Sequence, residues 1–270
     1  MMWKPLPRNK SKNNIAYFKA GNGPNLLMIH GVGLKAESWS AQINFFSQDY
    51  TIFAIDLPGH GESDNLKIES NNLNSYIEEI KLFVDEVIHN SFIIIGHSLG
   101  ALIAINYAKQ RKKNCAGIIA LNCIYQRSDE ALKKVKLRLR ELKSQNMNKE
   151  IELTIVRWFG KSPKGYLNEI SNVCRQWLLE SNKEGYLNAY DVFANQRGIA
   201  KEVLKKIQVP ITFITGSEDL NSTTLMSKNM ANFCFLGAFN EIKGAGHMAM
   251  MSHSDEVNRI IESFITMNSK

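Results

Sequence analysis

The stretch Phe92-Ile93-Ile94-Ile95-Gly96-His97-Ser98-Leu99-Gly100, followed by Ala101-Leu102-Ile103-Ala104-Ile105-Asn106-Tyr107-Ala108, decides how this chain folds. Its first four residues predict a short buried strand, and the eight residues after Gly100 predict a helix. Ser98 then lies at the apex of a sharp turn, in a strained backbone conformation, with glycines on both sides that let strand and helix pass closely. Such a turn presents the hydroxyl near the positive end of the helix dipole, which makes Ser98 a candidate nucleophile. The alternative is a tight connection with a surface serine.

A serine nucleophile needs a base, because the pKa of its own hydroxyl is too high for it to attack unaided. Only two of the six histidines, His247 and His253, lie in the last quarter of the chain. His247 lies in a glycine-rich loop after the apolar segment 235–242, and such a loop at a strand end presents an imidazole well. His253 precedes the predicted last helix (257–267), where a solvated helix-start residue is typical. We therefore predict His247 as the base.

The base needs an acid to orient it. Residues 209–215 predict a strand, and Gly216-Ser217-Glu218-Asp219 follows it. The earlier segment Leu121-Asn122-Cys123-Ile124 contains no carboxylate. Asp219 is therefore the predicted acid. Its neighbour Glu218 is expected to point elsewhere and to be solvated.

An oxyanion hole is predicted from a second glycine-containing loop. The apolar run 25–29 ends in His30-Gly31-Val32-Gly33, and glycines let this loop approach a ligand closely. Two backbone N–H groups stabilise the negative oxygen of a tetrahedral intermediate, and we expect them to come from Leu99 and Val32. The remaining histidines near the site are expected to be structural polar residues that hold loops by hydrogen bonds: His30, His60 and His97.

These residues together resemble the α/β-hydrolase superfamily, and the resemblance covers most of the chain. The run Asp56-Leu57-Pro58-Gly59-His60-Gly61-Glu62-Ser63 is similar to the D-x-x-G-x-G-x-S segment of that superfamily. The resemblance implies an α/β fold, a mostly parallel doubly wound sheet with an inserted helical cap. It also implies that Ser98, Asp219 and His247 form a triad in the family's chain order of serine, acid and histidine. A serine at the elbow disfavours haloalkane dehalogenases and epoxide hydrolases, which have an aspartate there.

Three segments look like the small carboxylesterases and enol-lactonases related to 3-oxoadipate enol-lactonase: Trp158-Phe159-Gly160, residues 185–194 and residues 219–224. This finer resemblance implies a serine hydrolase that cleaves a carboxylic ester, lactone or thioester of a small acyl substrate through an acyl-enzyme. Such chemistry requires no cofactor. Other functions on the same fold stay open: C–C bond hydrolysis of meta-cleavage products with the same triad, peracid formation, or a non-catalytic ligand receptor.

The length of 270 residues fits one large α/β domain with an insertion. Strand-like alternation is absent from about residue 125 to residue 205, where several helices are predicted. We therefore expect residues 1–124 and 206–270 to form the core and residues 125–205 to form a helical cap.

The positive charge is concentrated in the predicted cap. Residues 125–208 contain 17 Lys and Arg against 10 Asp and Glu, whereas the rest of the chain contains 16 of each. The segment Asp129–Lys143 places lysines and arginines on one helix face and leucines and a valine on another. The excess charge either attracts an anionic substrate, an acyl carrier protein or an acidic surface, or it is a solvated helix face. Nucleic-acid binding is not expected, because no recognised binding fold accompanies the charge.

Several other classes of protein are not expected from the composition. The hydrophobic fraction is 44%, and no run approaches the roughly 20 apolar residues of a membrane span. Residues 1–14 are basic and polar and do not resemble a secretory signal. The four cysteines are scattered without metal-ligand spacing, which predicts reduced thiols in a cytoplasmic protein. No zinc cluster, phosphate-binding loop or dinucleotide fingerprint is found, so neither a metal nor a cofactor is predicted. The oligomeric state stays open.

Overall fold

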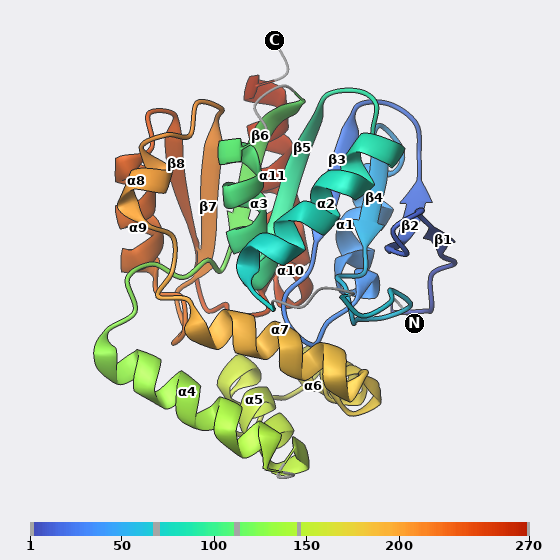
Figure 1. Ribbon diagram of the computed structural model, residues 1–270. Coiled ribbons are helices and arrows are strands. Elements are labelled where there is room, and N and C mark those ends of the chain that lie inside the picture. Colours follow the sequence, from blue (N-terminus) through green and yellow to red (C-terminus); the bar gives the residue numbers. More distant parts are fainter. Residues whose placement is uncertain (1–2, 67–70, 111–113, 145–146, 269–270) are drawn as a thin grey trace.

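The structure is a computed structural model that describes residues 3–66, 71–110, 114–144 and 147–268 (Figure 1). The remaining residues of the predicted core and cap, including both chain ends, lie outside the described residues. The described strands are β1 (Asn9–Lys10), β2 (Ala16–Ala20), β3 (Asn25–Ile29), β4 (Thr51–Ile55), β5 (Phe92–His97), β6 (Cys115–Leu121), β7 (Ile211–Gly216) and β8 (Gly237–Ile242).

The strands form one eight-stranded sheet in the order β1-β2-β4-β3-β5-β6-β7-β8. All neighbours from β4 through β3 to β8 pair in parallel, whereas β2 pairs antiparallel with β1 and β4. The order reverses on either side of β3, as in doubly wound sheets. The predicted fold class, a mostly parallel α/β sheet, is therefore confirmed.

Helices cover both faces of the sheet (Figure 1). One face is covered by α2 (Leu73–Val87), α3 (Leu99–Gln110), α8 (Lys201–Leu204) and α9 (Thr224–Phe233). The other is covered by η1 (Ala36–Trp39), α1 (Ser40–Phe46), α10 (Ala249–Ser252) and α11 (Ser254–Asn268). Because side chains alternate along a strand, Leu27 and Ile29 belong to the first apolar cluster while Leu26 and Met28 belong to the second. The central strands are buried on both faces, which explains their continuous apolar sequences.

Five described helices lie between β6 and β7. We call the first four of them the helical insertion: α4 (Asp129–Lys143), α5 (Met147–Phe159), α6 (Tyr166–Glu180) and α7 (Lys183–Asn195). They lie across the edge of the sheet where the parallel strands end (Figure 1). The predicted helix Asp129–Lys143 is confirmed as α4, and the Ser128 hydroxyl caps it by accepting from the N–H of Ala131. Ligands of open α/β sheets bind beyond the carboxyl ends of the strands, so the helical insertion is close to the expected site.

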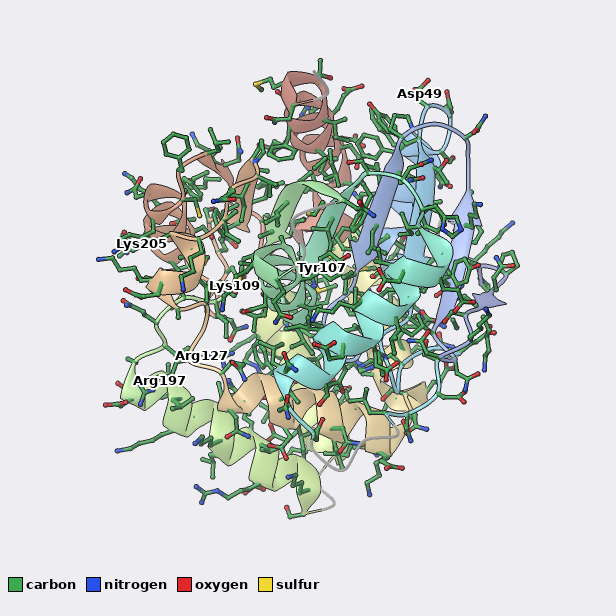
Figure 2. The ribbon with its side chains drawn as sticks, turned by 45° about the horizontal axis from the view of Figure 1, so that its top comes forward. Asp49, Tyr107, Lys109, Arg127, Arg197 and Lys205 are labelled. Carbon is green, nitrogen blue, oxygen red and sulfur yellow. The ribbon has the colours of Figure 1, made fainter. Side chains whose placement is uncertain are left out.

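The two connections between the sheet and the helical insertion are tied together. The N–H of Arg127 donates to the carbonyl of Arg197 at 2.7 Å, and the N–H of Ile199 donates to the carbonyl of Ile124 at 3.2 Å. The Arg127 guanidinium donates to the carbonyls of Phe193 and Gln196, and it stacks 4.0 Å from the centre of the Phe193 ring. Figure 2 shows Arg127 and Arg197 close together at this junction. The insertion therefore leaves and re-enters the sheet at one place.

Element boundaries differ from the sequence predictions by a few residues. The last helix begins at Ser254 rather than at residue 257, because Asp255 and Glu256 occupy its first turn, where the helix dipole favours acidic side chains. The predicted apolar segment 235–242 forms β8 only from Gly237 onward, and most of that edge strand is partly or fully exposed. None of the described helices is long and apolar enough to cross a membrane.

Candidate active site

Ser98 occupies a strained turn between β5 and α3. Its φ angle is 54°, in the left-handed region, and its N–H donates to the carbonyl of Leu121 at 2.9 Å. A Cβ on Gly96 would lie 2.3 Å from the carbonyl oxygen of Gly100, and a Cβ on Gly100 would lie 2.2 Å from that of Ile29. Neither position accepts a side chain, so the two glycines allow the close approach that holds Ser98 at the apex, as the sequence predicts.

Asp219 and His247 are joined by a buried hydrogen bond. The Nδ1 of His247 lies 2.7 Å from the Oδ2 of Asp219, and because a carboxylate only accepts, Nδ1 holds the proton and Nε2 is left to accept one. Asp219 also accepts from the side-chain amide of Asn122 at 2.8 Å and from the backbone N–H of Asn221 at 2.8 Å. Burial favours a raised pKa for Asp219, but the neighbouring His247 and these hydrogen bonds outweigh burial and hold the pKa below its ordinary value.

One pocket brings the predicted site residues together. Its lining includes Ser98, His247 and Val32. Leu99, at the start of α3, is buried directly after the serine. Within the described residues, the backbone N–H groups of Val32 and Leu99 donate no hydrogen bond, so both are available to a ligand oxygen. The Ser98 hydroxyl is not hydrogen-bonded to His247 here; in ligand-free sites such contacts are often long and tighten only when substrate binds.

Three buried histidines hold the loops around this pocket. His30 contacts the carbonyl of Gly31 through Nδ1 at 2.7 Å and accepts from the N–H of Leu57 through Nε2 at 2.9 Å. The Nε2 of His60 accepts from the N–H of Gly33 at 3.0 Å, and the Nε2 of His97 lies 2.9 Å from the carbonyl of His247. The structure therefore agrees with the prediction that His30, His60 and His97 are structural.

Burial is the main cause that lowers the pKa values of all three histidines, and for His97 it does so to about 3. The unfolded chain binds a proton at each of them below about pH 6.5, whereas the folded chain binds that proton only at lower pH. The free energy of unfolding is therefore highest above pH 6.5 and falls as the pH decreases towards 3. His97 alone is expected to contribute a loss of about 2 kcal/mol between pH 8 and pH 5.

Urea unfolding at pH 8, 7, 6 and 5 measures this dependence. His97→Gln is expected to remove about 2 kcal/mol of the difference between pH 8 and pH 5, because no proton-binding ring then remains at that position. His89→Gln, at an exposed position on the surface, is the matched control and should keep the wild-type slope. Equal slopes for wild type and His97→Gln would contradict the prediction.

The Asp56 carboxylate has a structural role beneath the site. It accepts from the N–H of Ala36 at 2.8 Å, from the N–H of Glu62 at 3.0 Å and from the Arg8 guanidinium at 2.8 Å. A Cβ on Gly61 would lie 2.2 Å from this carboxylate. The motif that begins at Asp56 therefore fixes the turn that presents His60 to the loop at residues 30–33.

Two arginines of the helical insertion also line the Ser98 pocket. Arg138, on α4, donates from Nε to the Tyr190 hydroxyl at 3.1 Å, and Arg157, on α5, donates to the Thr154 hydroxyl at 2.5 Å. Within the described residues neither guanidinium forms an ion pair. Burial, and then the charge of Arg138, lowers the pKa of Arg157. Two guanidinium groups outside any ion pair of the described residues give the pocket a positive potential that suits a carboxylate, and the buried Glu150 carboxylate on the same helix as Arg157 offsets part of it.

Arg138, Arg157 and Asn122 belong to the candidate site, and sequence reasoning missed them. The sequence showed the excess of positive charge in residues 125–208, but most of the α4 cations are exposed and only Arg138 turns inward. Asn122 directly follows β6, in the segment 121–124 that contains no carboxylate. A polar residue at the end of that strand was the signal that could have identified it as a partner of Asp219. Trp158 lines the pocket, whereas Met248 and Met250 in the loop and helix after His247 are buried in the core.

The chain belongs to the alpha/beta hydrolase family, whose model matches residues 26–260. The chain is 32% identical over 267 residues to (E)-2-((N-methylformamido)methylene)succinate hydrolase of Acinetobacter baylyi, and the match covers 94% of this chain and 95% of the relative.

Similar solved structures share the fold. A malate-bound thermophilic esterase from Thermogutta terrifontis has a TM-score of 0.85 at 21% identity, covering 98% of this chain and all of the esterase. The enol-lactonase from Burkholderia xenovorans has a TM-score of 0.84 at 18% identity, covering 96% of this chain and all of the lactonase. The protein is thus a hydrolase of the α/β family with esterase and lactonase structural neighbours.

Proposed function

We propose that this protein is a serine hydrolase that cleaves an acyl bond of a small, carboxylate-bearing substrate through an acyl-enzyme. The observation that carries the proposal is one pocket in which the hydroxyl of Ser98 lies on a strained elbow beside the imidazole of His247, which is hydrogen-bonded to Asp219. Residues 125–205 act in this proposal as a cap that closes the pocket.

The proposed mechanism follows from the protonation states. His247 accepts the Ser98 proton at Nε2 as the hydroxyl oxygen attacks the substrate carbonyl, and Asp219 stabilises the imidazolium that forms. The N–H groups of Val32 and Leu99 bind the negative oxygen of the tetrahedral intermediate. The imidazolium then protonates the leaving group, and the neutral imidazole later activates a water molecule that hydrolyses the acyl-enzyme.

The substrate class is inferred from Arg138 and Arg157. A partly buried guanidinium outside an ion pair is stabilised by a ligand carboxylate, which it binds through paired hydrogen bonds. The substrate named for the Acinetobacter baylyi relative is a substituted succinate, a dicarboxylate with an N-formyl group. The substrates to test are therefore small acyl compounds with at least one free carboxylate: esters, lactones, thioesters and N-acyl compounds.

Matched pairs of anionic and neutral esters test this substrate class. Arg157→Met and Arg138→Met are each expected to lower kcat/KM for monomethyl succinate by about 10- to 100-fold, because a hydrogen bond to a charged group contributes about 1.5–3 kcal/mol. The same variants should change kcat/KM for neutral methyl butanoate by less than about threefold. Arg140→Met, at an exposed position on α4, is the control.

Other outcomes would point away from the proposed substrates. Equal losses on both esters in the Arg138 and Arg157 variants would contradict a role in carboxylate recognition. Tight binding of a carboxylate ligand without turnover of any acyl substrate would favour a ligand receptor over an enzyme.

A further inference from the structure

The pocket around Ser98 is too small for a substrate in this structure. Its volume is about 40 Å³, far below the roughly 300 Å³ at which pockets for small molecules usually begin. Part of the pocket wall must therefore move before Ser98 and His247 can meet a substrate.

A second cavity of about 370 Å³ lies on the other side of one section of that wall. We call it the outer cavity; it is bordered by the last turn of α5 and by the loops that follow β7 and β8. Its lining includes Arg157, Trp158, Glu218, Leu220, Gly246 and His253. Arg157 and Trp158 line both cavities. By contrast, the cavity beside Gly33 and His60 shares no lining residue with the Ser98 pocket.

The Trp158 side chain is the part of this partition that can move. Its ring faces the His247 imidazole, with centroids 6.1 Å apart and planes inclined by 28°. Within the described residues its indole N–H makes no hydrogen bond, and the residue is only partly buried. The backbone is more constrained, because a Cβ on Gly246 would lie 2.7 Å from the Trp158 carbonyl. Rotation of the indole breaks no hydrogen bond within the described residues. It gives up the stacking on His247, an edge contact with the Phe159 ring 6.4 Å away and packing against the second apolar cluster.

We propose that the outer cavity is the entrance for small carboxylate-bearing substrates and that the Trp158 indole is its gate. Arg157 borders both spaces, so a carboxylate that enters the outer cavity meets a guanidinium that also faces the Ser98 pocket. Movement of the indole away from His247 joins the two cavities, and its return excludes bulk water from the acyl-enzyme. This inference rests on the proposed function, because it takes Ser98 as the destination.

Blocking the outer cavity tests the entrance. Leu220 lines it and is 82% exposed, so Leu220→Cys offers a site for a bulky maleimide. The four native cysteines are buried, and burial raises the pKa of each thiol, so the new cysteine is the preferred target. Labelling is expected to lower kcat/KM of the Leu220→Cys protein at least tenfold relative to the same protein unlabelled.

Leu225→Cys is the matched control. Leu225, on α9, is 64% exposed and borders neither cavity, so its maleimide adduct should keep kcat/KM within twofold of the unlabelled variant. An adduct at position 220 with kcat/KM within twofold of the unlabelled variant would overturn the entrance. The test requires that turnover depends on Ser98; turnover that persists in Ser98→Ala would contradict the proposed function instead.

Variants of Trp158 test the gate separately. Trp158→Ala opens the partition permanently, so the ratio of kcat/KM for a naphthyl ester to that for a methyl ester should rise about tenfold. Trp158→Phe keeps an aromatic ring over His247 and should restore a ratio within threefold of wild type. A ratio that is unchanged in Trp158→Ala would overturn the gate, whatever the absolute activities of the two variants.

Discussion

Ser98→Ala is expected to lower kcat/KM for acyl substrates by about 10⁴-fold or more, because removal of the nucleophile of a triad leaves only binding and oxyanion stabilisation. The replacement removes only one oxygen atom, and the backbone at φ 54° is held by Gly96 and Gly100 rather than by the serine side chain. The variant should therefore fold normally, and the loss should appear in kcat rather than in thermal stability.

Initial rates on a panel of p-nitrophenyl esters, lactones and thioesters measure the effect. Ser91→Ala is the matched control, because Ser91 is exposed and lies at the opposite end of β5. It is expected to keep wild-type activity. A Ser98→Ala protein that retains activity within tenfold of wild type would rule out the acyl-enzyme.

Asp219→Asn is expected to lower kcat by about 10³- to 10⁴-fold with little change in KM. A carboxylate accepts from Nδ1 of His247 and so fixes the tautomer whose Nε2 can take the Ser98 proton. An amide can donate to Nδ1 instead, which stabilises the opposite tautomer and removes the base from the reaction. Asn122 and the backbone N–H of Asn221 would then face a neutral oxygen or an NH₂ group.

Measurement of kcat and KM for Asp219→Asn and for a control variant tests whether Asp219 orients His247. Asp49→Asn is the control, since Asp49 is exposed just before β4, at the end of the sheet away from the helical insertion (Figure 2). A kcat within tenfold of wild type in Asp219→Asn would show that another group orients His247. A raised KM at unchanged kcat would place Asp219 in substrate binding instead.

Local sequence patterns predicted the parts of the site that the sheet itself positions. The elbow at Ser98 depends on two glycines and on apolar neighbours within a few residues, and such short-range constraints are visible in a sequence. Asp219 and His247 each follow a strand, and parallel strands bring their carboxyl ends to one edge. The hydrogen bond between them therefore follows from chain order and strand direction.

The residues supplied by the helical insertion were not predictable in this way. Whether Arg138 or its neighbours on α4 faces the pocket depends on the rotation of that helix, and its packing against α7 sets that rotation. Arg157 and Trp158 lie in the last turn of α5, whose position depends on contacts with α6. The fine structure of the pocket is thus a tertiary property, whereas the elbow and its partners are a local one.

The junction at Arg127 and Arg197 has an evolutionary consequence. Because the two connections of the insertion are hydrogen-bonded to each other at the sheet, everything between them is geometrically a single long loop. A segment whose ends meet can be lengthened, shortened or exchanged by recombination without moving the strands on either side. Exchange of that segment as a unit would replace Arg138, Arg157 and Trp158 together, while Ser98 and Asp219, which lie outside it, would stay in place.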